Sequence, residues 1–219
     1  MCGRIAQFDK DKLAERYSVR PGPSFDATPR WNVAPGQYAL VITAYGLETM
    51  KWGLIAGNVK GSEVGKAHKH INAMAETIAE KPTFMHALHK RRCIIPASGF
   101  YEWLGRQPYY FHPTKDDVFS LAGLYEVRRD AEGRDYKTFC IITTKPNATV
   151  EPVHNRMPAI LLREAEELWL DPYIAEPAQL LPLLTSYPAT VMAAYPVPAL
   201  VGSVRNDGPE LIHRLRQAS

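Results

Sequence analysis

The sequence predicts a β-rich α+β fold, formed as a single domain over residues 1–219 from mixed or antiparallel, barrel-like sheets with a few short helices. Three observations predict this class. Apolar runs of strand length alternate with turn residues through the middle of the chain. The 18 prolines are scattered over the 219 residues, which favours many short elements over long helices. Strands and helices do not alternate regularly, so a parallel doubly wound sheet is not expected.

The N-terminal part combines short strands with loops rich in Pro, Gly or Lys. Asp9 is placed to cap the first helix, in which Leu13 and Tyr17 share a face. The elements predicted in this part are a strand at 2–7, a helix at 10–19, a loop at 20–36, strands at Tyr38–Thr43 and Thr49–Leu54, a loop at 56–70 and a short helix at Ile71–Ala79.

The remainder of the chain alternates strand patterns with turns and ends in short helices. Glu132-Gly133 lies in a polar segment typical of a hairpin turn. The predicted elements are strands at Arg92–Ile95, Phe100–Leu104, Tyr109–His112, Phe119–Val127 and Lys137–Thr144, helices at Arg163–Leu170 and Ala178–Leu184, and a last strand at Thr190–Pro196.

Composition bounds the function without identifying it. The formal charge of +3 permits nucleic-acid binding but does not require it, because a local patch matters more than the total charge. No apolar run reaches the length of a membrane helix, and the N-terminus lacks the apolar segment of a signal peptide. We therefore expect no membrane partner and a cytoplasmic location, associated with the nucleoid if the source is bacterial. The unpaired cysteines indicate a reducing compartment, and we also expect a monomer.

The three cysteines, Cys2, Cys93 and Cys140, are an odd number without paired spacing. This argues against a disulfide framework and against a cysteine zinc site. Cys93 and Cys140 each lie in an apolar run, which is typical of core residues.

Cys2 has a chemistry that no internal cysteine shares. Removal of Met1 would leave an α-amine and a thiol on adjacent carbons. The amine can form an imine with an aldehyde, and the thiol can then close a five-membered thiazolidine ring. The α-amine has a pKa of about 7.7–8.0, so much of it is nucleophilic near neutral pH. The alternative is an incidental cysteine at a frayed terminus.

Three other segments carry candidate functional side chains, each with a structural alternative. Strand alternation places Phe100, Glu102 and Leu104 on one face, where burial would raise the pKa of the glutamate; the alternative is an edge strand with Glu102 in solvent. His154 follows a polar loop and could act as acid or base, or simply meet water. Asn72 could hold a hydroxyl or an oxyanion, or could cap the helix predicted at Ile71–Ala79.

Other patterns are less informative. The basic run at 89–92 could contact phosphates, although such runs are more often solvated. His68 and His70 lack further ligands at suitable spacing, so we expect no metal. Walker and Rossmann glycine patterns are absent, and nothing indicates an organic cofactor.

Taken in order, these segments resemble one family, the SOS-response-associated peptidase (SRAP) domain, which includes proteins that crosslink to abasic sites in DNA. The resemblance extends from residue 2 to about residue 212 and is specific as an ordered set rather than piece by piece. The segments that carry it are Met1-Cys2-Gly3-Arg4, Trp31 to Gly36, Lys51 to Ile55, Ile71-Asn72-Ala73, Arg91 to Trp103 and His154 to Pro158.

The resemblance implies a groove for single-stranded DNA carrying abasic sites. It implies that Cys2 is the crosslinking nucleophile, Asn72 holds the opened sugar, Glu102 moves protons and His154 acts as acid or base. Arg4, the Asn32–Pro35 loop and Arg156 would contact DNA, and Trp103 with Pro35 would wedge against bases. It also implies autocatalytic removal of Met1 and a largely single-turnover, lyase-like reaction without metal or cofactor.

The sequence departs from the family where arginine and tryptophan are usual. Met74 and Met85 stand where arginine is common, and Ala56-Gly57-Asn58 replaces a segment with proline and tryptophan. Because such side chains supply phosphate contacts and stacking, we predict weaker binding of DNA with the covalent chemistry kept. Lys66, Lys69 and Lys81 are the candidates to compensate.

Three rival functions remain open at this point. The Met-Cys-Gly start is shared with amidohydrolases that use an N-terminal cysteine, and Cys2 with His154 could serve a thiol peptidase acting on other proteins. The third rival is a non-catalytic reader of single-stranded or modified DNA.

Overall fold

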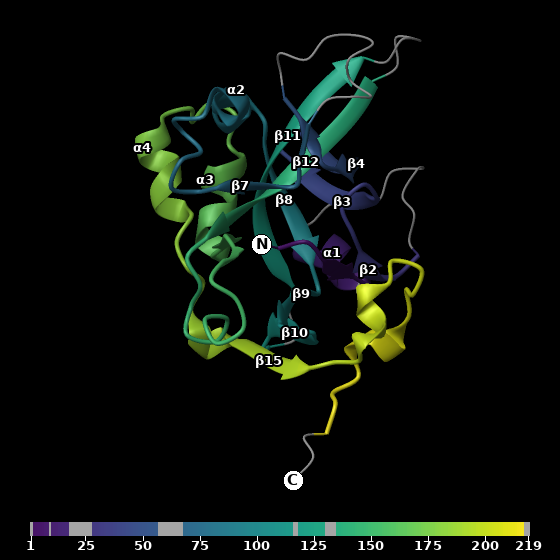
Figure 1. The fold of residues 1–219 in the computed structure, drawn as a ribbon. Helices are drawn as coiled ribbons and strands as arrows, with labels where there is room; N and C mark the ends of the chain where they lie inside the picture. The colour runs from purple at the N-terminus through teal and green to yellow at the C-terminus, as the bar shows by residue number, and fades with distance from the viewer. Residues whose placement is uncertain are drawn as a thin grey trace.

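A closed barrel forms the larger part of the computed structural model, which describes residues 2–8, 10–17, 28–56, 68–115, 118–129 and 135–216. The strands of the larger sheet follow one another in hydrogen-bonded order, and the last pairs back onto the first, so the sheet closes (Figure 1). In that order they are β12 (Asp135–Thr144), β4 (Gly46–Trp52), β3 (Tyr38–Thr43), β8 (Arg92–Ala97) and β11 (Phe119–Arg129).

Short strands extend this barrel at its rim. The strands β4 and β7 pair in parallel with β12, and the other pairs in the sheet are antiparallel, as the prediction of a mixed sheet requires. The added strands are β7 (Asn72–Met74) and β13 (Met157–Pro158) on β12, and β14 (Ile160–Leu161) on β11, while β5 (Leu54–Ile55) and β6 (Lys69–His70) form a separate pair.

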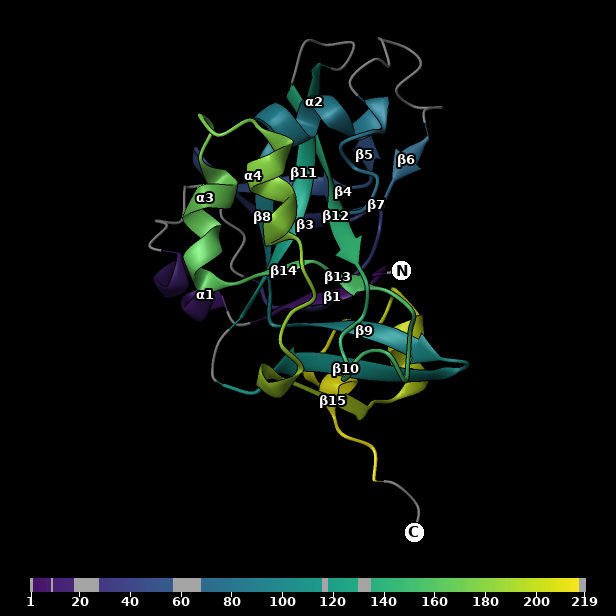
Figure 2. The same cartoon turned by 90° about the vertical axis from the view of Figure 1, so that its left-hand side faces the viewer.

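A second, five-stranded sheet packs below the barrel. Figure 2 shows the barrel above, this sheet below, and the N-terminus of the chain near the level at which they meet. The sheet is antiparallel throughout. Its order is β15 (Met192–Pro196), β10 (Gln107–Pro113), β9 (Gly99–Leu104), β1 (Ile5–Gln7) and β2 (Arg30–Val33).

Strand alternation divides the apolar residues between two main cores. On β8, Cys93 and Ile95 belong to the core between the sheets, whereas Ile94 belongs to the core under the helices. The helices are α1 (Lys10–Arg16), α2 (Pro82–Lys90), α3 (Glu166–Leu170) and α4 (Pro177–Leu180), with 3₁₀ turns at Arg163–Ala165, Leu181–Leu183, Ala189–Val191, Ala199–Gly202 and Pro209–Ile212. Cys93 and Cys140 are fully buried, which confirms their assignment to the core.

The helix predicted at Ile71–Ala79 is wrong. Residues 72–74 form β7 beside β12, and turns follow, because pairing with a buried strand overrides the helical preference of a short Ala-rich segment. The predicted loop 20–36 contains β2 at its end, and the helix α2 was not predicted. The Asp9 cap, the Glu132-Gly133 turn, residues 20–27 of the first predicted loop and residues 57–67 of the second lie outside the described residues.

Candidate functional site

Pairing of β1 with β9 determines where the N-terminal segment lies. Ile5 is opposite Phe100 and Ala6 is opposite Gly99, and the amide of Tyr101 donates to the carbonyl of Arg4 at 3.0 Å. The residues before β1 therefore run antiparallel to β9, toward Glu102. Cys2 is thus held beside a strand instead of lying at a free end.

The Cys2 side chain is fully buried and belongs to the core between the two sheets. Burial raises the pKa of its thiol, and the nearby negative charge of Glu102 raises it further. The thiol is therefore protonated at neutral pH, and its reaction needs a group that accepts the proton. Glu102 is the carboxyl group whose charge acts on this thiol, which makes it the candidate acceptor.

Glu102 lies on the inner face of β9, as the alternation pattern predicted. Phe100 belongs to the core between the sheets and Tyr101 to the core on the opposite face. The Glu102 side chain is almost fully buried, and the loss of solvation raises its pKa, with the charge of His154 acting in the opposite direction. The alternative of an edge-strand glutamate in solvent is excluded.

His154 approaches the same carboxylate from the loop before β13. Its Nε2 lies 3.9 Å from Oε2 of Glu102. Its Nδ1 lies 3.0 Å from the amide nitrogen of Arg156, which can only donate. The neutral ring can accept this hydrogen bond with its own proton on Nε2, facing Glu102. The carbonyl of Arg156, 3.1 Å from Nδ1, offers an acceptor when the ring is protonated. One residue can thus hold His154 in both charge states.

Asn72 lies on β7, so its alternative role as a helix cap is excluded. Its Nδ2 donates to the carbonyl of Ile141 at 3.4 Å, and its Oδ1 is buried without a hydrogen-bond partner among the described residues. A buried amide oxygen in this state favours binding of a donor such as a hydroxyl. The neighbouring Ile71 packs against the core cluster that contains Cys2.

Asn32 requires a correction, because its side chain is fully buried and has no surface for DNA. Its Nδ2 donates to the carbonyls of Val201, Ser203 and Asn206, at 3.3, 3.0 and 2.6 Å. Its Oδ1 accepts from Arg4 at 2.7 Å. Asn32 therefore orders the 201–206 segment and holds Arg4.

Arg4 and Trp103 form one surface feature. The guanidinium carbon of Arg4 lies 5.9 Å from the centre of the Trp103 ring, and Nη1 also donates to the carbonyl of Val201 at 2.8 Å. Trp103 is half-buried, and Pro35 lies exposed in a separate turn before β3. A cation beside an aromatic ring is suited to bind a phosphate next to a stacked base.

Arg156 makes contacts that sequence reasoning missed. Its guanidinium forms two parallel hydrogen bonds with the carboxylate of Glu76, at 2.7 and 2.8 Å, and a third with the carbonyl of Thr143 at 2.6 Å. Glu76 and Arg156 are 80 positions apart, and β7 and β13 both pair with β12. No local pattern could indicate a contact that depends on this pairing.

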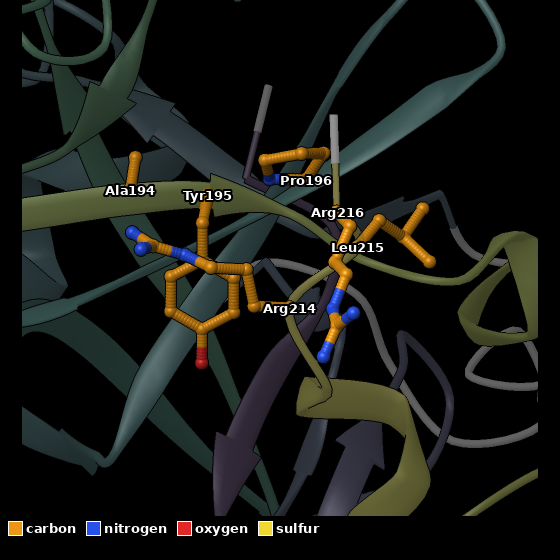
Figure 3. A pocket seen from close by; sticks show the side chains of 6 residues that line it. All are labelled: Ala194, Tyr195, Pro196, Arg214, Leu215 and Arg216. Carbon is orange, nitrogen blue, oxygen red and sulfur yellow. The ribbon is translucent and has the colours of Figure 1, made fainter. Parts of the chain in front are cut away.

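A separate hollow of about 330 Å³ lies at the edge of the second sheet (Figure 3). Arg214 extends across the ring of Tyr195, with its guanidinium carbon 5.0 Å from the ring centre. The lining residues are Ala194, Tyr195, Pro196, Arg214, Leu215 and Arg216. Because this set contains none of the residues singled out from the sequence, the candidate site lies elsewhere.

Neither a metal-ligand cluster nor a membrane helix is found in the described ranges. No three His, Cys, Asp or Glu side chains among them could jointly hold a metal ion. The ring of His70 packs against Phe84, 5.3 Å between centres. No helix in the part of the chain that the structure describes is long and apolar enough to cross a membrane.

The closed barrel and the second sheet place the chain in a β-rich α+β class, with the second-position cysteine beside a buried carboxyl–imidazole pair. The chain belongs to the SOS response associated peptidase (SRAP) family, whose model matches residues 1–204. This confirms the resemblance drawn from the sequence.

Relatives and solved structures agree with this membership. The chain is 42% identical over 223 aligned positions to the abasic site processing protein YoqW of Bacillus subtilis, covering 97% of this chain and 99% of that protein. It is 32% identical to the abasic site processing protein HMCES of Gallus gallus, over 76% of this chain and 56% of that protein. A crystal structure of a Bacteroides thetaiotaomicron protein, 30% identical, superposes with a TM-score of 0.87 over 98% of this chain and 100% of that one.

Proposed function

We propose that this protein processes abasic sites in single-stranded DNA by bonding to them covalently through Cys2. The names of the relatives, abasic site processing proteins, support the substrate class. The observation that carries the chemistry is the position of Cys2, whose thiol is close enough to Glu102 for the carboxylate to raise its pKa. His154 faces the same carboxylate.

The reaction requires that Met1 first be removed by hydrolysis of its peptide bond. Cys2 then carries a free α-amine next to its thiol. Glu102 and His154 are suited to support this hydrolysis, since one group can accept a proton from water while the other donates to the leaving amine. This step would account for the peptidase in the family name.

Capture then proceeds in three steps. Glu102, whose raised pKa favours the protonated form, assists opening of the closed sugar to its aldehyde. The α-amine adds to the aldehyde carbon and one water leaves, giving an imine. The thiol sulfur then bonds to the imine carbon, and the thiol proton ends on the nitrogen, with the carboxylate as carrier. The product is a neutral thiazolidine ring that needs no oxidant or reductant.

The neighbouring side chains have supporting roles in this proposal. Asn72 offers its unsatisfied Oδ1 to a hydroxyl of the opened sugar. Arg4 and Trp103 contact a phosphate and a base, and Pro35 contributes an exposed surface beyond them. Asn32 acts indirectly by holding Arg4.

A denaturing gel with a labelled single-stranded oligonucleotide carrying one abasic site tests the proposal. Wild type should give a shifted band that survives denaturation, and Cys2→Ala and Cys2→Ser should give none. Cys140→Ala is the matched control, because burial raises the pKa of this core thiol to about 12 and it has no part in the reaction. It should retain the band.

The gel result can be interpreted only if it is known whether Met1 has been removed. Mass spectrometry should show loss of Met1 in the wild type. A processed protein that gives no band would refute the crosslinking proposal. Unchanged DNA binding by Cys2→Ala would then favour a non-catalytic reader, and glutamine hydrolysis or cleavage of a foreign peptide would favour an amidohydrolase or a thiol peptidase.

A further inference from the structure

The Arg156 side chain is already occupied by an anion from the protein itself. Its two terminal nitrogens form parallel hydrogen bonds with both carboxylate oxygens of Glu76, at 2.7 and 2.8 Å. This is the geometry in which arginine binds planar or tetrahedral oxyanions most strongly. A DNA phosphate that uses the same two nitrogens must first displace the carboxylate.

In this pair the carboxylate is the more exposed partner and the arginine has the additional anchor. The Arg156 side chain is 15% exposed and the Glu76 side chain 35% exposed. Arg156 is further anchored by the Thr143 carbonyl on β12, at 2.6 Å. Glu76 lies in the turn after β7, the strand that pairs with β12 (Figure 2), and its carboxylate is held by the two hydrogen bonds from the arginine. The pKa of Glu76 is lowered by its hydrogen bond to Arg156, so the carboxylate is charged at neutral pH.

The location of the pair connects it to the candidate site. The backbone amide of Arg156 holds Nδ1 of His154, whose Nε2 faces Glu102. Met74, which is exposed, lies two positions before Glu76 on the same segment. A phosphate arriving at Arg156 would therefore lie beside the residues that we propose to act on the sugar.

We propose that Glu76 competes with a DNA phosphate for Arg156 and thereby lowers the affinity for undamaged single-stranded DNA. Glu76 acts through Arg156 and is a positioning residue. The inference rests on the proposed function only in taking single-stranded DNA as the ligand. Competition from Glu76 keeps reversible binding to intact DNA weak. A covalent crosslink to an abasic site, once formed, is not limited by this competition.

The test compares Glu76→Gln with Glu80→Gln in the full-length protein. Both variants remove one negative charge from the same segment, and Glu80 is an exposed residue four positions further on. Binding to a labelled undamaged oligonucleotide is measured by fluorescence anisotropy at several salt concentrations. Glu76→Gln should bind several-fold more tightly at low salt. The slope of log affinity against log salt should steepen by about 0.7, the value for one added phosphate contact on a single strand.

Arg156 provides the decisive control. In an Arg156→Gln background, Glu76→Gln should change affinity no more than Glu80→Gln does. The proposal is overturned if the two single variants bind alike, or if the gain from Glu76→Gln persists without Arg156. Circular dichroism checks the fold, and Glu76→Ala serves as a second variant with the same expected slope.

These readouts use undamaged DNA and do not depend on crosslinking. A wild type that crosslinks while Glu76→Gln behaves like Glu80→Gln would defeat this inference alone. A wild type that does not crosslink, with the Arg156-dependent gain intact, would defeat the proposed function alone.

Discussion

Burial of Glu102 affects both the stability of the protein and the proposed proton transfer, because it changes the pKa of this carboxyl group. The residue is almost fully buried, and desolvation raises its pKa. Above the unfolded pKa of about 4.3, the unfolded state releases this proton more readily than the folded state does. The contribution of Glu102 therefore lowers the free energy of unfolding as pH rises through the interval between the two pKa values.

This decrease of the free energy of unfolding with rising pH leads to a prediction for Glu102→Gln. The amide keeps the shape and cannot ionise, so the variant should be more stable than wild type at neutral pH, and the difference should shrink as pH falls below the unfolded pKa. Urea unfolding at several pH values measures it. The rate of crosslinking should fall by about 10²-fold or more, because a proton carrier is lost. A variant that is less stable at neutral pH, or that crosslinks normally, would contradict the assignment.

At the scale of the element, a strand can be predicted from the sequence only when its own residues show the composition typical of a strand. The strand predicted at Tyr38–Thr43 coincides with β3, because its residues are apolar along most of its length and the last three are β-branched. The strand β7 has only three residues and exists through its pairing with β12. The helix α2 does carry a local pattern that indicates a helix, with Pro82 at its start and Phe84, Ala87 and Leu88 on its buried face.

In the candidate site too, some residues could be predicted from their local sequence and others depend on distant partners. The residues Cys2, Glu102 and His154 were singled out by their chemistry and by the order of their motifs, and the structure brings them together. The role of Asn32 could not be predicted, because its carbonyl partners are about 170 positions away in the sequence. A polar residue in a strand gives no local indication of which distant segment it orders.

The bonding of Asn32 gives a prediction about the strand β2 and the segment 201–206. Asn32→Ala removes the donors to three carbonyls, that of Val201 among them buried, and the acceptor for Arg4, so it should lower the free energy of unfolding by about 1–3 kcal/mol. Asn206→Ala removes one exposed side-chain bond, to the carbonyl of Leu200, and should change stability by about 0.5 kcal/mol or less. Urea unfolding compares the two, and equal effects would show that Asn32 does not order the segment.

At the scale of the whole molecule, affinity for DNA depends on how the modest net charge of +3 is distributed. The cations around the candidate site are partly engaged by the protein: Arg156 by Glu76, and Arg4 by Asn32 and the Val201 carbonyl. Met74 and Met85, at 42% and 39% exposure, add neutral surface at the two positions where the family resemblance led us to expect arginine. The protein should therefore bind undamaged single strands weakly, with a shallow dependence on salt.

Restoring charge at these two positions tests this interpretation. Both methionines are exposed enough for arginine to replace them without burying its charge. Met74→Arg and Met85→Arg should each tighten binding and steepen the salt slope by about 0.7 if the new side chain reaches a phosphate. Leu168→Arg, on α3, adds the same charge at a residue of 36% exposure and is the control. If all three variants gain equally, the effect is one of net charge alone. A gain confined to Met74 and Met85 would locate the path of the DNA along β7 and α2, because counterions are released only where a cation meets a phosphate.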